Sequence, residues 1–139
     1  MEEQIIRSAQ VVLQAFIDEM REWEIKWNKI SKEYDDFIPE YLEKDQLKEV
    51  INIQDKCLSK KALSLEQSRR SVLNFRTPPE HDQVITGYEI INKKKIEFLA
   101  TNEYADLYYK YWVILEDDGW KIDAKKKDSD NWRTRRQLF

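Results

Sequence analysis

The stretch Tyr108–Asp123, YYKYWVILEDDGWKID, contains three tyrosines, two tryptophans and an Asp-Gly dipeptide near its centre. Asp-Gly flanked by alternating apolar residues is the sequence that a two-residue type I′ turn prefers. We therefore predict a β-hairpin that turns at Asp118–Gly119. That turn sets the strand register and places Leu115 opposite Ile122.

The predicted register divides the hairpin side chains between two faces, because cross-strand partners project from the same side of a sheet. The first face is apolar and consists of Tyr109, Tyr111, Val113, Leu115, Trp120, Ile122 and Ala124. The second face is mixed and consists of Tyr108, Lys110, Trp112, Ile114, Glu116, Lys121 and Asp123. A slip of one residue would mix the two sets, so the pattern specifies the register. We expect the first face in the core, and the second either covered by the C-terminal tail through Trp132 and Leu138 or open to a partner.

Two helices are predicted upstream of the hairpin. Apolar residues recur at steps of three and four over about Glu3–Ile30, which indicates an amphipathic helix. Its apolar stripe is Ile5, Ala9, Val12, Leu13, Phe16, Met20, Trp23, Trp27 and Ile30. Pro39 interrupts the pattern, and a second helix is predicted over about Asp45–Lys60, with a stripe that ends at Leu58. Residues 62–75 fit either a helix or a strand.

After Pro78–Pro79 the period of the apolar residues changes to two. Residues 84–101, VITGYEIINKKKIEFLAT, predict two strands joined at Asn92–Lys95, and Ile96, Phe98 and Ala100 share one face. Helices followed by antiparallel strands indicate an α+β fold, with N-terminal helices packed on a curved antiparallel sheet. The length of 139 residues suits a single domain that covers residues 1–139.

Composition argues against several classes of function. Cys57 is the single cysteine and His81 the single histidine, so neither a disulfide nor a zinc site is predicted, and we expect a packed or half-buried thiol. Residues 1–49 carry 13 acidic and 7 basic side chains, and residues 50–139 carry 14 acidic and 17 basic ones, which does not suit a nucleic-acid-binding protein. The chain has no basic leader and no apolar run of membrane-spanning length. We therefore expect a soluble, cytoplasmic protein without a cofactor or a membrane partner.

Four features of the sequence carry a family resemblance: Trp23-Glu24, KKKIEFLAT, YYKYWVILEDDGWKIDAKK and the following Trp132. With the order of elements, they make the chain similar to the nuclear transport factor 2-like cone fold. More narrowly, the chain resembles the immunity proteins of that fold in bacterial polymorphic toxin systems. The resemblance implies a protein that binds and neutralises the toxin domain encoded beside it and catalyses no reaction. It implies no particular contact residues.

The same cone fold hosts small-ligand-binding proteins and isomerase or dehydratase enzymes, which are the alternative together with a protein-binding adaptor. An enzyme of this kind needs a base and a proton donor in an apolar pocket. His81 lies between Glu80 and Asp82 in a loop, where a histidine is usually solvated. Asp106 or Asp123 beside a tyrosine would imitate a base and donor, but the register puts Asp123 on the mixed face.

Two surfaces are candidates for binding the toxin. The first is the acidic connection between the helices, which consists of Glu33, Asp35, Asp36, Glu40, Glu43 and Asp45. It would attract basic residues of a toxin or imitate a phosphate backbone. The second is the mixed hairpin face around Tyr108, Lys110 and Trp112, since tryptophan and tyrosine are frequent hot-spot residues. This face would serve equally as the seam of a homodimer.

Overall fold

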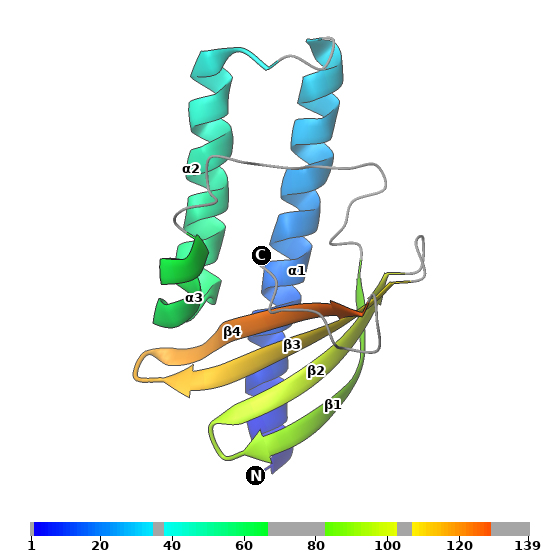
Figure 1. Ribbon diagram of the computed structural model, residues 1–139, viewed down its shortest axis with the longest axis vertical. Coiled ribbons are helices and arrows are strands. Elements are labelled where there is room, and N and C mark those ends of the chain that lie inside the picture. Colours follow the sequence, from blue (N-terminus) through cyan, green and yellow to red (C-terminus); the bar gives the residue numbers. More distant parts are fainter. Residues whose placement is uncertain (1, 35–37, 67–82, 103–106, 129–139) are drawn as a thin grey trace.

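The computed structural model describes residues 2–34, 38–66, 83–102 and 107–128. The described elements are α1 (Glu2–Glu33), α2 (Glu40–Cys57), α3 (Lys60–Glu66), β1 (Val84–Asn92), β2 (Lys95–Asn102), β3 (Leu107–Glu116) and β4 (Gly119–Asp128). The strands form one antiparallel sheet in the order β1-β2-β3-β4. α1 crosses one face of this sheet, and α2 returns alongside α1 (Figure 1). The predicted α+β architecture is confirmed. None of the helices in the described ranges has both the length and the apolar character needed to cross a membrane.

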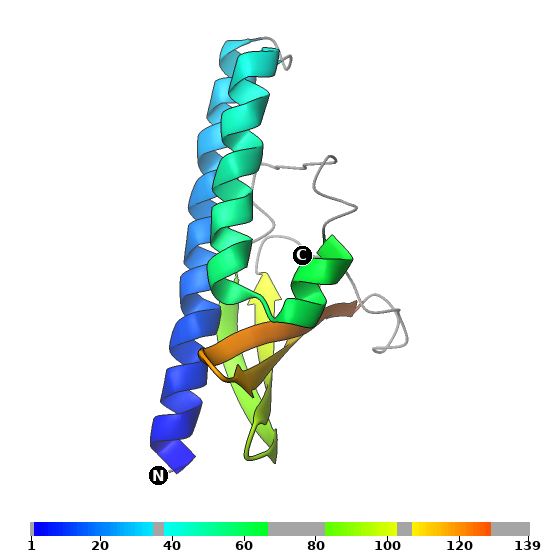
Figure 2. The ribbon, with the colours of Figure 1, turned by 90° about the vertical axis from the view of Figure 1, so that its left-hand side faces the viewer.

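The helical hairpin of α1 and α2 extends well beyond the sheet (Figures 1 and 2). α1 covers the predicted range, and its buried apolar residues are Ile6, Ala9, Leu13, Phe16, Ile17, Met20, Trp23 and Trp27. The predicted stripe was wrong at its first member, because Ile5 is 37% exposed and Ile6 is buried instead. A step of three residues back from Ala9 leads to Ile6, whereas the predicted step of four leads to Ile5.

α2 begins immediately after Pro39, five residues earlier than predicted. The Pro39 carbonyl accepts hydrogen bonds from the backbone N–H groups of Leu42 and Glu43, and proline is well suited to the start of a helix. α2 ends at Cys57, and Leu58 is extended with φ −92° and ψ 150°. The predicted helical position of Leu58 was therefore wrong, and Leu58 instead forms a parallel bridge with Ile122 of β4.

Residues 58–62 close the β4 edge of the sheet. The Ser59 N–H donates to the Ile122 carbonyl at 2.9 Å, and the Ser59 hydroxyl donates to Asp123 at 2.7 Å. The same hydroxyl accepts from the Ala62 N–H at 3.1 Å, so Ser59 caps the first turn of α3. α3 shows that the first residues of 62–75 are helical, and the remainder lies outside the described ranges.

The β3–β4 hairpin is confirmed, but its turn lies one residue earlier than predicted. Glu116 pairs with Gly119, so Asp117 and Asp118 form the turn, and Gly119 follows with a positive φ of 123°. Leu115 consequently lies opposite Trp120 rather than Ile122. The observed strand register therefore differs from the predicted register by two residues. Because side chains alternate between faces, a shift of two keeps Val113, Leu115, Trp120 and Ile122 on one face.

A β-bulge next to Trp112 changes the faces farther along β4. Ala124 lies opposite Trp112, which corrects its predicted place on the core face, and Lys125 lies opposite Tyr111. Lys125 is only 2% exposed, and its Nζ lies 5.7 Å from the centre of the Tyr109 ring. An extra residue in one strand reverses all later side chains, and no turn or period signal marks the place of this bulge.

The core lies between the helices and the inner sheet face. As predicted, Ile96, Phe98 and Ala100 are at most 1% exposed, and they pair with Val113, Tyr111 and Tyr109 of β3. A hydroxyl inside the core is satisfied, because Tyr111 donates to the Gln83 side chain at 2.7 Å. The predicted cover of the outer face by Trp132 and Leu138 lies outside the described residues.

Candidate interaction surfaces

The free end of the helical hairpin, which we call the tip, carries two tyrosines that the sequence reasoning did not select. The tip comprises Glu33, Tyr34, Glu40, Tyr41, Glu43 and Asp45. Tyr41 is 66% exposed and Tyr34 is 40% exposed. A hydrogen bond between their hydroxyl groups raises the pKa of Tyr34 above its ordinary value. The signal in the sequence was the presence of two tyrosines, Tyr34 and Tyr41, between the acidic residues of the connection.

The tip is also acidic. Glu33, Glu40, Glu43 and Asp45 are all exposed, and none of them has an ion pair among the described residues. Glu40 and Glu43 lie in the first turn of α2, where the helix dipole favours negative charge. The predicted Asp35 and Asp36 lie outside the described ranges. A partner could therefore bind these described carboxylates without first breaking an ion pair within the described part of the chain.

Contacts between α1 and α2 hold the tip in a fixed position. Lys26 forms an ion pair with Glu49 at 2.8 Å, and the Trp27 indole donates to the same carboxylate at 3.4 Å. The Trp23 indole donates to the Gln46 carbonyl at 3.2 Å, and both residues are buried. These bonds fix the rotation of one helix against the other. A partner would therefore meet a preformed surface, which limits the entropy lost on binding.

The predicted sheet surface around Tyr108, Lys110 and Trp112 lies on the face opposite the helices. β3 brings the three side chains together on this outer sheet face, and Tyr108 is 46% exposed. Lys110 contacts Glu97 of β2 at 3.9 Å, and the Nζ of Lys126 lies 5.9 Å from the Trp112 ring. The Trp112 indole and Lys110 thus already contact other side chains of the sheet. We therefore rank this surface below the tip as a site for a partner.

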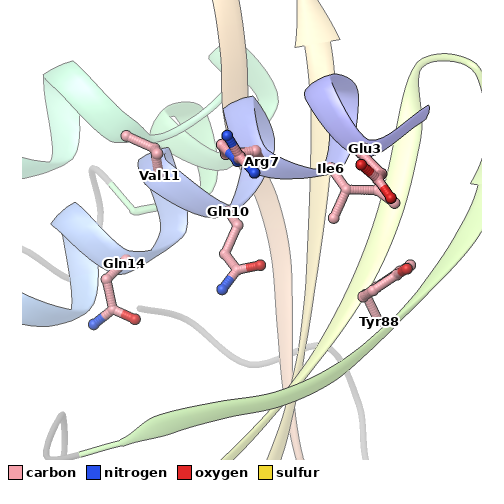
Figure 3. Close-up of a pocket in the computed structure, with 7 residues that line it drawn as sticks. All are labelled: Glu3, Ile6, Arg7, Gln10, Val11, Gln14 and Tyr88. Atoms are coloured by element: carbon pink, nitrogen blue, oxygen red, sulfur yellow. The ribbon is translucent and has the colours of Figure 1, made fainter. Parts of the chain in front are cut away.

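A groove of about 540 Å³ separates the first turns of α1 from β1. Its walls, which define the α1–β1 groove, are Glu3, Ile6, Arg7, Gln10, Val11, Gln14 and Tyr88. Figure 3 shows Tyr88 rising from β1 on the other side of this groove from the labelled α1 side chains. Tyr88 is 55% exposed and Val11 is 61% exposed, so the groove is open to solvent.

Of the residues that suited an enzyme, Asp123 is the one that the structure describes. Asp123 accepts a hydrogen bond from Ser59 at 2.7 Å, and this bond supports the cap of α3. His81 and Asp106 lie outside the described residues. Within the described ranges, no group of His, Cys, Asp and Glu side chains is arranged to hold a metal ion. Cys57 is buried, as predicted, and this burial raises the pKa of its thiol to about 11.

Comparison with known proteins identifies the class of this protein. The family model for NTF2 fold immunity proteins matches residues 8–135, so the chain belongs to this family. The chain is also similar to the immunity protein RhsIA of Dickeya dadantii strain 3937, with 29% identity over 134 residues. That match covers 91% of this chain and 94% of the relative. No solved structure matches the chain. The predicted resemblance and the predicted toxin-neutralising immunity function are confirmed.

Proposed function

We propose that this immunity protein neutralises the C-terminal domain of the toxin encoded beside it by binding that domain through the tip. It acts as a single domain in the cytoplasm of the producing cell and catalyses no reaction. The observation that supports this role is the family match, which spans nearly the whole chain. The relative RhsIA is itself named an immunity protein.

The tip is favoured because it combines the two properties that protein interfaces use. Tyr34 and Tyr41 supply aromatic surface at the end of a rigid support, and tyrosine is enriched among hot-spot residues. The surrounding carboxylates lack internal ion pairs in the described ranges and would accelerate association with a basic surface. A toxin domain with a cationic active site or nucleic-acid-binding groove fits this chemistry.

The outer sheet face is the second proposed contact surface, with Tyr108, Lys110 and Trp112 as its members. It also remains the proposed seam of a sheet-face homodimer. A tyrosine on each surface allows a matched comparison, because Tyr41 and Tyr108 are both exposed and the start of α2 lies far from β3 (Figure 1).

The experiment is a titration of the purified toxin domain with the wild type, Tyr41→Ala and Tyr108→Ala. Binding through the tip predicts a loss of at least tenfold in affinity for Tyr41→Ala, which corresponds to about 1.4 kcal/mol. Tyr108→Ala should bind like the wild type. The reverse pattern would assign the outer sheet face as the contact surface, and no binding by the folded wild type would refute the proposed partner.

A further inference from the structure

α1 and α2 lie side by side (Figure 2), and three side-chain pairs join them. From the sheet toward the tip, these pairs are Glu19 with Lys56, Lys26 with Glu49, and Tyr34 with Tyr41. From one pair to the next, α1 advances by seven and then by eight residues, and α2 goes back by the same numbers. A helix completes one turn in about 3.6 residues, so successive pairs are about two turns apart. The pairs thus share one antiparallel register, and a shift of one helix along the other would break all of them.

The pair nearest the sheet is supported by other contacts. The Lys121 ammonium donates to the Lys56 carbonyl at 2.9 Å. Leu58 forms its parallel bridge with Ile122 of β4. Both contacts attach the end of α2 to the sheet without using the Lys56 side chain. Loss of the ion pair between Glu19 and Lys56 should therefore leave α2 in place at this end.

The middle pair belongs to a cluster that we call the Glu49 clamp, which consists of Glu49, Lys26 and Trp27. The Lys26 ammonium donates to both oxygens of the Glu49 carboxylate, at 2.8 and 2.9 Å, and the Trp27 indole donates to it at 3.4 Å. The same ammonium lies 5.2 Å from the centre of the Trp27 ring. Two neighbouring side chains of α1 therefore converge on one carboxylate of α2. Because hydrogen bonds are directional and apolar packing is not, the clamp fixes the rotation of α2 as well as its position along α1.

The Glu49 clamp lies between the tip and the contacts at the sheet. Tyr41 comes eight residues before Glu49, and Tyr34 comes eight residues after Lys26. The clamp is therefore about 12 Å from the tyrosine pair along each helix. Nearer the tip, the Gln46 amide nitrogen is buried and has no hydrogen-bond partner among the described residues. The Gln46 amide nitrogen thus adds no directional bond between the helices.

We propose that Lys26 and Glu49 are positioning residues for toxin recognition. They keep α2 in the register that joins the two tyrosines of the tip, and they act through these tyrosines rather than by contact with the toxin. This inference rests on the proposed function of the tip. The Lys26 and Glu49 side chains are 52% and 35% exposed, and an ion pair as exposed as this contributes little to the free energy of unfolding. Its effect should appear in binding, because a tip that is no longer preformed loses more entropy when the toxin binds.

Four single substitutions by methionine in the full chain test this role. Lys26→Met and Glu49→Met each break the Glu49 clamp, whereas Lys56→Met and Glu19→Met each break the matched ion pair at the sheet end. Calorimetric titration of the purified toxin domain should show about threefold to tenfold weaker binding for both clamp variants. Both sheet-end variants should bind like the wild type.

The signs of the effects separate positioning from direct contact. If Lys26 and Glu49 contacted a basic toxin surface, loss of the lysine would strengthen binding and loss of the carboxylate would weaken it. Positioning predicts that both losses weaken binding. Opposite signs would therefore overturn the inference, and so would wild-type affinity in the clamp variants. Equal weakening by the sheet-end variants would also overturn it, because that result would indicate a general loosening of the helical hairpin.

Titration of the Tyr34 phenol is a second readout that requires no toxin. The hydrogen bond with Tyr41 raises the pKa of Tyr34, so breaking the clamp should lower this pKa toward its ordinary value. The lost charge itself has little effect at about 12 Å, because salt screens it. NMR of tyrosines labelled at the hydroxyl-bearing carbon, with Tyr34→Phe to assign the signal, should show the decrease in both clamp variants and no change in Lys56→Met.

An unchanged Tyr34 pKa in the clamp variants would overturn the inference, whatever their affinity for the toxin domain. A folded wild type that binds no toxin domain would refute the proposed function instead. In that case the Tyr34 titration would still show whether the Glu49 clamp holds the tyrosine pair together.

Discussion

Replacing Gly119 by alanine tests the hairpin turn that organises the sheet. Gly119 has φ 123°, a value that residues with a side chain rarely adopt. A Cβ atom added there would meet no heavy atom within 4 Å, so no steric clash contributes to the cost. The remaining cost is backbone strain, which amounts to about 1–3 kcal/mol for a residue held in a disfavoured region. We expect Gly119→Ala to lower the free energy of unfolding by that amount.

Gly87→Ala is the matched control, since Gly87 and Gly119 are the two glycines of the chain. Positive φ is recorded for Gly119 alone of the two, and a Cβ at position 87 would lie 3.8 Å from the Leu99 side chain, which is an ordinary contact. Alanine at such a site restricts the unfolded chain and commonly stabilises by about 0.4–1 kcal/mol. Both variants replace glycine by alanine. Opposite changes in their free energies of unfolding would therefore be due to the different backbone conformations of the two sites.

Urea unfolding followed by circular dichroism measures both variants, and a thermal scan gives an independent value. For a chain of this size, each kcal/mol lowers the melting midpoint by about 4 °C. A Gly119→Ala variant as stable as the wild type, or a Gly87→Ala variant less stable than Gly119→Ala, would contradict this prediction. Equal stability would mean that residue 119 does not need positive φ, and hence that the turn is not at Asp117 and Asp118.

Three further predictions concern the tip, the β4 edge and the buried thiol. Glu40→Gln with Glu43→Gln should slow association with the toxin domain and flatten its salt dependence, as stopped-flow mixing at several ionic strengths would show, whereas an unchanged rate would exclude steering by the tip. Ser59→Ala should lower the free energy of unfolding by about 1–2 kcal/mol, because it removes the cap of α3 and leaves Asp123 without its 2.7 Å donor, and a loss below about 0.5 kcal/mol would contradict that role. Burial raises the pKa of Cys57 to about 11 from an unfolded value of about 8.5, so the thiol should resist alkylation at neutral pH until the protein unfolds. Because the folded pKa is the higher one, the contribution of Cys57 to stability is complete below about pH 8.5 and is lost as the pH rises through about 11, so the difference from Cys57→Ala should shrink across that window in urea titrations.

The long elements and the two faces of the hairpin could be predicted because each rests on a repeated signal. Nine apolar positions at helical spacing defined α1, and one misplaced member, Ile5, did not change the result. The faces of β3 were right although the turn was misplaced, because a shift of two residues preserves alternation. A pattern that repeats over many residues therefore predicts an element correctly even when one position is misassigned.

The remaining differences depend on single residues and on tertiary contacts. The bulge that brings Lys125 into the core has no repeated signal, and it falls at Asp123, whose carboxylate accepts a hydrogen bond from Ser59. The earlier start of α2 depends on the carbonyl of Pro39, which a pattern of apolar residues does not include. The acidic part of the tip was predictable from charge alone, whereas the joined tyrosines required the two helices to be placed side by side. The α1–β1 groove likewise depends on where the fold places β1 beside the first turns of α1.

We propose that the tip is the surface through which this chain binds and neutralises its neighbouring toxin domain. The most direct measurement is calorimetric titration of that purified domain with the wild type and Tyr41→Ala, after both are shown to be equally folded. We expect a tight, stoichiometric complex for the wild type and at least tenfold weaker binding for Tyr41→Ala. Equal affinity for both proteins would contradict the proposed surface, and the absence of any complex with the wild type would contradict the proposed partner.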